Sequence, residues 1–203
     1  MNDAERPAYH AGMRRLQDRF DTRRLADRLD ERLARRAFSD EDCAFIESRP
    51  LFFLATADGE GRPDCSFKGG APGFVRVTGE AELAFPSYDG NGMFRSVGNL
   101  LVNPAVALLF IDFEKPRRLR VNGSASVAED DPLLATVTGA QLIVRVSAER
   151  IFPNCPCYIH RMTTVEPSPY VPRNGYTPPA PKWKRFDEFA DVLPRNDPAR
   201  SNR

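Results

Sequence analysis

The stretch that decides the fold is Phe85–Pro104, FPSYDGNGMFRSVGNLLVNP. It starts like the end of a strand, is interrupted by polar and glycine residues at 87–92, and continues as a predicted helix. Asn91 is a candidate N-cap, and Arg95 lies one turn further on. A glycine-rich loop, a helix N-terminus and a positive charge favour a phosphate or carboxylate site, with an ordinary strand–turn–helix connection as the alternative. The predicted helix has four apolar positions: Met93, Val97, Leu100 and Leu101.

Length and charge narrow the class of protein. A chain of 203 residues is long enough for one domain with a sizeable core. The 29 basic and 28 acidic residues leave a net charge of +1, which provides no general attraction to nucleic acid or to an anionic membrane. No apolar run approaches the ~20 residues of a membrane helix, and the N-terminal segment MNDAERPAYH lacks the hydrophobic core of a secretory signal. We therefore expect a cytoplasmic protein with neither a nucleic-acid nor a membrane partner.

Residues 1–50 are predicted to form a helical arm. Apolar residues recur at intervals of three to five over 13–36, with arginine and aspartate between them, which indicates an amphipathic helix packed on a core or on a partner subunit. A nucleic-acid arm is the less favoured alternative, because acidic residues nearly balance the arginines. Ser39–Asp42 resembles a capping box for a second, short helix with Phe45 and Ile46 facing inward.

From residue 51 onward the period changes to that of β-strands. The expected strands cover 51–57, 62–68, 74–77, 81–85, 105–113, 118–127 and 141–152. A short helix is also expected at 131–137, starting with a proline at its first position. We expect about six strands from these segments, joined by short turns and interrupted by one helix. This arrangement predicts a mainly β fold built as a small antiparallel barrel.

The segment 118–127 alternates between two faces. Its apolar face consists of Leu119, Val121, Gly123, Ala125 and Val127. The opposite face begins with Arg118, Arg120 and Asn122, which are side chains that can meet a polar ligand. A phosphate or dimer contact is the preferred interpretation of these arginines, and a solvated strand edge is the alternative.

The C-terminal segment 167–203 contains eight of the 18 prolines and little periodicity. This composition predicts an extended tail that either wraps a surface or stays mobile. Trp183, which lies between two lysines, is a candidate anchor for it.

The four cysteines are too few and too scattered for a disulfide scaffold. Cys155 and Cys157, followed by His160, offer soft ligands for zinc, but no fourth ligand is evident. A disulfide across one intervening residue is strained, so the sequence favours ordinary packing of these sulfurs and predicts no metal site. No paired carboxylates or Ser–His–Asp pattern stands out, and we assign no catalytic residue.

Three linked motifs carry a family resemblance: ATADGEGRPDCSFKGG at 55–70, FPSYDGNGMFRSVGNLLVNPAVALLFIDF at 85–113, and RRLRVNGSA at 117–125. In this order they resemble the FMN-binding split β-barrel family of pyridoxamine 5′-phosphate oxidase and its relatives, over roughly 45–164. The segment FPNCP at 152–156 also resembles a subgroup of functionally uncharacterised members. The resemblance implies a six-stranded antiparallel split β-barrel at 51–166, between the arm and the tail.

The family also implies a homodimer that binds two FMN molecules in clefts between the subunits, where a small-molecule substrate would meet the flavin. Lys68 and Arg95 would neutralise the phosphate, and Gly69 and Gly70 would permit close approach of the backbone to the ring. The residues that match FMN-contacting segments are Ser66, Phe67, Lys68, Gly69, Pro86, Ser87, Tyr88, Arg95, Arg118 and Arg120.

The sequence departs from the true oxidases at two aligned positions. Ser66 stands where those enzymes carry arginine, and Leu119 stands where they carry glutamine. Their C-terminal Arg–x–His pattern is also missing. The resemblance therefore implies an FMN-dependent oxidoreductase with an unidentified small-molecule substrate, and these departures argue against pyridoxamine 5′-phosphate oxidase activity itself. The alternatives are a non-catalytic module for a flavin or another phosphorylated cofactor, and a split barrel that binds deazaflavin or haem.

Overall fold

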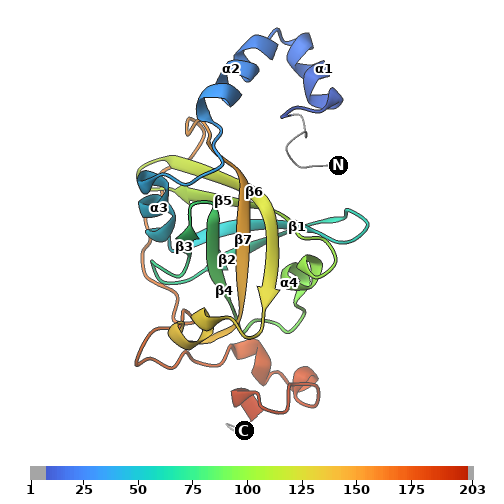
Figure 1. The fold of residues 1–203 in the computed structure, drawn as a ribbon. Coiled ribbons are helices and arrows are strands. Elements are labelled where there is room, and N and C mark those ends of the chain that lie inside the picture. The colour runs from blue at the N-terminus through green and yellow to red at the C-terminus, as the bar shows by residue number, and fades with distance from the viewer. Residues whose placement is uncertain (1–7, 201–203) are drawn as a thin grey trace.

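Residues 8–200 are described by a computed structural model, and an antiparallel seven-stranded sheet lies at its centre (Figure 1). The strands are β1 (Leu51–Ala57), β2 (Pro63–Gly69), β3 (Arg76–Gly79), β4 (Glu82–Tyr88), β5 (Ala105–Asp112), β6 (Arg117–Ala128) and β7 (Ala140–Pro153). Their order in the sheet is β2-β1-β5-β6-β7-β4-β3. The predicted mainly β fold is therefore confirmed. The predicted count of six is wrong, because all seven of the expected segments contribute strands to the sheet.

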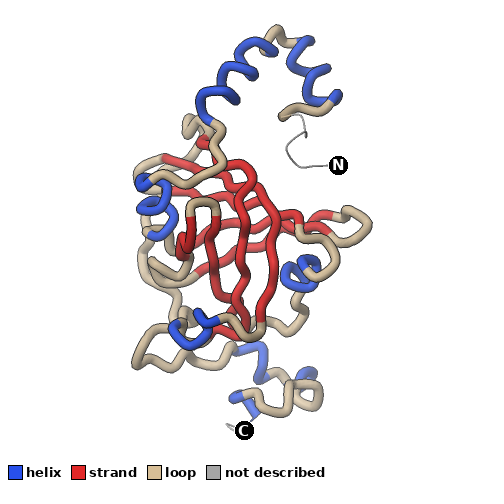
Figure 2. Tube along the Cα trace, viewed as in Figure 1, coloured by secondary structure: helices blue, strands red, loops and turns tan. Residues whose placement is uncertain are grey.

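The sheet curls without closing. In Figure 2, β1, β2 and β5 run across the direction of β4 and β7, and the long β6 joins the two groups. Within residues 8–200, β2 and β3 stand at opposite ends of the strand order and do not pair with each other. The sheet therefore keeps two open edges and does not form a closed barrel. The predicted small barrel is confirmed only as a curled antiparallel sheet.

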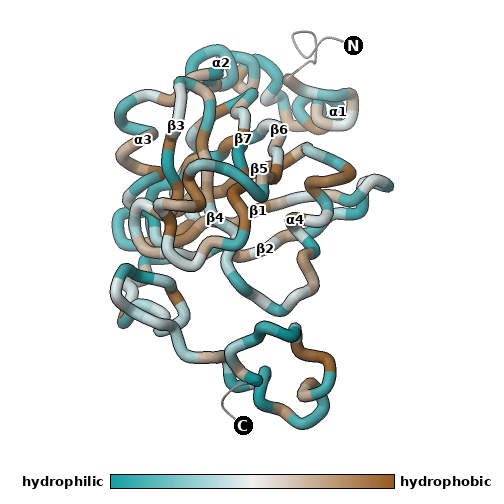
Figure 3. Tube along the Cα trace, turned by 60° about the horizontal axis from the view of Figure 1, so that its bottom comes forward, coloured by the Kyte–Doolittle hydropathy of each residue, from teal (hydrophilic) through white to brown (hydrophobic). Residues whose placement is uncertain are grey.

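An aromatic cluster fills the inside of the curled sheet. Phe52 is fully buried on β1, and its ring lies 5.0 Å from Phe85, 5.2 Å from Phe110 and 5.9 Å from Phe74. The alternation along the strands explains this core, because every second side chain of β1 and β6 points inward. In Figure 3 the strands carry much of the hydrophobic colour.

The helices lie outside the sheet. They are α1 (Ala11–Arg19), α2 (Arg23–Leu33), α3 (Asp40–Glu47) and α4 (Arg95–Leu100). Short 3-10 helices occur at Pro132–Thr136, Lys182–Arg185, Asp187–Phe189 and Pro198–Arg200. The first of these takes the place of the α-helix expected at 131–137. Within the described range, no helix has the length and apolarity needed to cross a membrane.

The N-terminal arm is two helices rather than one. The single helix predicted over 13–36 is wrong, because Asp21 adopts a left-handed φ of 51° and breaks the chain between α1 and α2. The two helices project away from the sheet (Figure 1), and neither buries a side chain within this chain. Leu16, Phe20 and Leu25 are more than half exposed, so the arm does not pack on the core of its own chain. Residues 1–7 of the predicted arm and 201–203 of the predicted tail lie outside the described range.

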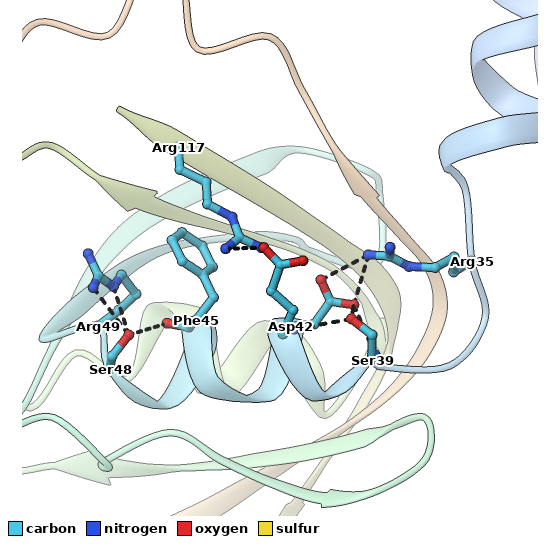
Figure 4. Close-up of polar contacts among 8 residues, drawn as sticks. Arg35, Ser39, Asp42, Phe45, Ser48, Arg49 and Arg117 are labelled. Carbon is cyan, nitrogen blue, oxygen red and sulfur yellow. Dashed lines mark hydrogen bonds and ion pairs between the residues drawn. The ribbon is translucent and has the colours of Figure 1, made fainter. Parts of the chain in front are cut away.

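The capping box before α3 is confirmed (Figure 4). The Ser39 hydroxyl accepts the backbone N–H of Asp42 at 3.2 Å, and the Asp42 carboxylate accepts the backbone N–H of Ser39 at 3.0 Å. Asp42 is buried and also accepts two hydrogen bonds of 2.8 Å from the Arg35 guanidinium. Phe45 and Ile46 are buried as predicted, so α3 is fixed at its start by polar bonds and along its face by apolar contact.

Candidate cofactor-binding site

A cavity of about 350 Å³ lies between β2, the end of β4, the loop at 89–94 and α4. Ligand pockets in proteins range from roughly 300 to 1,000 Å³, so this one is at the lower end. Six of the ten residues predicted to contact the cofactor line it: Ser66, Phe67, Lys68, Ser87, Tyr88 and Arg95. The structure thus brings together side chains from two of the three segments on which the prediction was based, the one around β2 and the one at 85–95.

The alternation of β2 produces the polar wall of this cavity. Asp64, Ser66 and Lys68 are half-buried, whereas Cys65 and Phe67 between them are exposed. β2 pairs with β1 along one side and is the last strand of the sheet on the other. A ligand can therefore approach the polar face of β2 from an open edge.

A polar network joins α4 to this wall. The hydroxyl of Ser96, a buried residue of α4, lies 2.8 Å from the Ser66 hydroxyl and 3.2 Å from an Asp64 carboxylate oxygen. The other Asp64 oxygen lies 3.8 Å from Nε of Arg95. Sequence reasoning missed Asp64 and Ser96. The signal for Asp64 was present, since it shares one strand face with Ser66 and Lys68.

Lys68 stands out by its lack of a partner. Its ammonium group makes no hydrogen bond or ion pair with any residue in the part of the chain that the structure describes. Burial lowers the pKa of Lys68, partly offset by the negative charge of Asp64. Arg95 is 73% exposed and only loosely paired. Because a half-buried cation without a partner is costly, the cavity favours an anionic group.

Tyr88 lines the same cavity at the end of β4. Burial raises the pKa of its phenol, so the group stays neutral and able to donate a hydrogen bond. With the hydroxyls of Ser66 and Ser87, it offers uncharged polar contacts along the same cavity. The cavity therefore combines positive charge with hydroxyl groups.

The prediction that Asn91 caps the helix is wrong. α4 begins only at Arg95, and its N-cap position is Phe94, which has a left-handed φ of 48° and makes no side-chain capping bond. The side chain of Asn91 instead accepts the backbone N–H of Met93 at 3.1 Å and so stabilises the turn before the helix. The loop is therefore shaped by its own turn, and α4 is only six residues long.

The remaining predicted residues lie elsewhere. Gly69 and Pro86 belong to β2 and β4 but do not line the cavity. Arg118 and Arg120 lie on β6, which β1 and β5 separate from β2. Gly70 packs against the Phe74 ring, where an added Cβ would overlap the ring carbons, so its close approach is to the core. The structure therefore does not place the two β6 arginines in this cavity.

The C-terminal segment reaches the loop at 89–94 through a buried lysine. The Lys184 ammonium donates to the Asp89 carboxylate at 2.7 Å and to the buried Asp197 carboxylate at 2.8 Å. Burial acts to lower the pKa of Lys184, but the hydrogen bonds to Asp197 and Asp89 outweigh it and raise the pKa. Trp183 is only half-buried and packs edge-on against Phe189. The residue that joins this segment to the loop is thus Lys184, next to the predicted anchor.

Replacing Lys184 with methionine should release this segment. Hydrogen bonds to charged groups contribute ~1.5–3 kcal/mol, so chymotryptic cleavage after Phe186 or Phe189 should become roughly tenfold faster or more, because cleavage follows the population of the open form. Limited proteolysis followed by mass spectrometry measures the rate. Lys182→Met, at an exposed lysine of the same helix, is the matched control. Equal cleavage rates in Lys184→Met and wild type would show that the ion pairs do not hold the segment.

Comparison with known proteins identifies the family. The family model described as pyridoxamine 5′-phosphate oxidase matches residues 38–155. Among solved structures, a candidate pyridoxamine 5′-phosphate oxidase from Lactobacillus delbrueckii is 24% identical, with 58% of this chain and 95% of that chain covered and a TM-score of 0.48. HupZ from Group A Streptococcus is 18% identical, with 57% and 94% covered and a TM-score of 0.46.

A third structure, HutZ of Vibrio cholerae, is described as a haem storage protein. It is 23% identical, with 53% of this chain and 88% of that chain covered and a TM-score of 0.42. No curated protein matches this chain. The family model covers more than half of the 203 residues, including β1 to β7 and α4. The predicted membership is therefore confirmed, and the chain belongs to the pyridoxamine 5′-phosphate oxidase family.

Proposed function

We propose that this protein binds FMN in the cavity between β2, β4 and α4 and acts as an FMN-dependent oxidoreductase on a small molecule. One observation carries the proposal: Lys68, a half-buried cation without a partner in the described chain, lines the same cavity as Arg95. Two positive charges suit a phosphate. The hydroxyls of Ser66, Ser87 and Tyr88 suit the polar chain that links the phosphate of FMN to its ring.

Asp64 is the feature of this cavity that opposes an anion. Both of its carboxylate oxygens already face donors, namely the Ser96 hydroxyl at 3.2 Å and the Arg95 guanidinium at 3.8 Å. Opposite charge close to a carboxylate reduces its repulsion of a second anion. We therefore propose that Lys68 and Arg95 bind the phosphate and that Asp64 holds Arg95 in position.

Apolar side chains on the cavity wall suit the flavin ring and a second subunit. Phe67 is 62% exposed and Phe94 is 51% exposed, so two large aromatic side chains of the cavity wall are open to a ligand or a partner. A cavity of about 350 Å³ is also small for a whole flavin nucleotide. We propose a homodimer in which a second copy of the chain completes the site, as the family resemblance implies.

When bound, FMN itself supplies the hydride or electron transfer. The residues of this chain would hold the phosphate, present hydroxyl groups and shield the ring from water. None of them has to act as a general acid or base, and we assign no catalytic residue. The predicted cytoplasmic location stays a prediction from the sequence.

The absorption spectrum of the purified protein tests the proposal. We expect a yellow protein with about one FMN per chain, identified by mass spectrometry of the released ligand. Bleaching by a nicotinamide donor and reoxidation coupled to substrate turnover would support the oxidoreductase, whereas a bound but inert flavin would support a binding module. A colourless protein that takes up no FMN at micromolar concentration, or a spectrum of haem or deazaflavin, would contradict FMN as the cofactor.

A further inference from the structure

Two cysteines outside the proposed FMN site lie side by side on the surface. Cys155 and Cys157 follow directly after β7, both are exposed, and both are free thiols. Their side chains face each other, with the sulfur atoms 2.7 Å apart. The expectation that they pack as small apolar side chains is therefore wrong.

A positive charge lies beside this pair. β6 and β7 pair with Leu119 opposite Pro153, so Arg118 and Asn154 are the next residues along the two strands. Nε of Arg118 is buried and has no hydrogen-bond partner in the range 8–200, and no carboxylate pairs with its guanidinium there. The charge of Arg118 is thus left to act on the nearby sulfurs.

The two thiols differ in acidity as a result of this arrangement. The pKa of Cys155 is lowered, mainly by its contact with the Cys157 sulfur, with a smaller effect from the charge of Arg118. The pKa of Cys157 is raised by the same contact. Since the thiolate is the form that reacts, these directions favour Cys155 as the attacking sulfur and Cys157 as the second thiol.

We propose that Cys155-Pro156-Cys157 is a redox-active dithiol that exchanges electrons with low-molecular-weight disulfides. In the first step, the Cys155 thiolate attacks one sulfur of the small disulfide, forms a mixed disulfide and releases one thiolate. In the second step, the Cys157 thiolate attacks the Cys155 sulfur and releases the other thiolate. The protein loses two electrons and two protons, and the small disulfide is reduced to two thiols.

Geometry favours this chemistry over a metal site. A structural zinc site needs four protein ligands, and this pair supplies two. In the described part of the chain, no group of three or more metal-binding side chains gathers that could hold an ion. Disulfide formation needs only a small further approach of the two sulfurs.

The single intervening residue decides what kind of disulfide would form. A ring closed over one residue is strained, and strain makes a disulfide easier to reduce. Exposed, strained disulfides are typically labile and take part in exchange, whereas unstrained ones are structural. The pair is therefore suited to cycling between dithiol and disulfide. This proposal does not depend on the proposed FMN site.

The test equilibrates the full-length protein with mixtures of reduced and oxidised glutathione, followed by rapid alkylation and mass spectrometry. The tryptic peptide 151–161 contains Cys155 and Cys157 and no other cysteine. We expect this peptide to lose two hydrogen atoms as the mixture becomes oxidising and to regain them when it is reducing. Cys65, which is exposed and has no neighbouring thiol, is the internal reference and should only gain a glutathione adduct.

Two variants sharpen the result. Cys157→Ser removes the second thiol, so Cys155 should stop at the mixed disulfide with glutathione. Cys65→Ser should leave the oxidation of the peptide unchanged. The proposal is overturned if the wild-type peptide carries two glutathione adducts, if it stays reduced wherever Cys65 is modified, or if Cys157→Ser gives the same product as wild type.

Discussion

Replacing Lys68 with methionine is expected to weaken FMN binding roughly 10- to 150-fold, since a hydrogen bond to a charged group contributes ~1.5–3 kcal/mol and 1.4 kcal/mol is a factor of ten. Methionine is close to lysine in length and removes the charge. The half-buried Lys68 has no partner in the described chain, so its loss should not break an internal contact. Titration of flavin fluorescence against apoprotein measures the dissociation constant.

Two matched variants separate charge at this position from charge in general. Lys115→Met removes an exposed lysine from the turn between β5 and β6, away from the cavity, and should bind FMN like wild type. Lys68→Arg keeps the charge and should retain most of the affinity. Burial lowers the pKa of Lys68 and the charged form binds the anion, so wild-type affinity should fall as pH rises through that pKa. Unchanged affinity in Lys68→Met would place the phosphate elsewhere.

Gly123→Ala is expected to destabilise the protein by ~3 kcal/mol and to lower its Tm by roughly 6–12 °C. Gly123 lies on β6 where the register with β7 shifts. An added Cβ would overlap the carbonyl oxygen of Ser147 and lie 3.0 Å from its carbonyl carbon. These are backbone atoms of the paired strand, so no flexible side chain can move aside. Thermal unfolding followed by circular dichroism measures the effect.

Gly98→Ala is the control for this substitution. Gly98 lies inside α4, and an added Cβ there would meet nothing within 4 Å. Alanine favours a helix over glycine, so Gly98→Ala should leave Tm unchanged or raise it slightly. If Gly123→Ala unfolds at the same temperature as Gly98→Ala, the close approach of β6 and β7 is not important for stability.

The strands could be predicted well from the sequence because apolar alternation and turn residues are local signals. β1 begins and ends as expected, and the apolar face of β6 is buried as expected. The break at Asp21 could not be predicted, since the spacing of apolar residues is the same in one helix or two. Asn91 was misassigned because it can stabilise a turn as readily as it caps a helix.

The site could be predicted only in part, because local patterns indicate the face of a strand but not its position in the sheet. The family resemblance identified β2 and the 87–95 segment, which meet in the cavity. For Arg118 and Arg120, alternation indicated the correct face of the strand, but only the strand order shows that β6 lies away from β2. Lys184 gave no local signal, because its partners Asp89 and Asp197 are identified only once the C-terminal segment is placed.

The strand order has a consequence for how this protein is made. β1 pairs with β5, and β4 pairs with β7, so each must wait for a partner that is synthesised much later. Contacts between distant parts of a chain slow folding and leave strand edges open during synthesis. The nascent chain can therefore complete its sheet only after residue 153 has left the ribosome, and a chain stopped before residue 140 would expose β4 to aggregation.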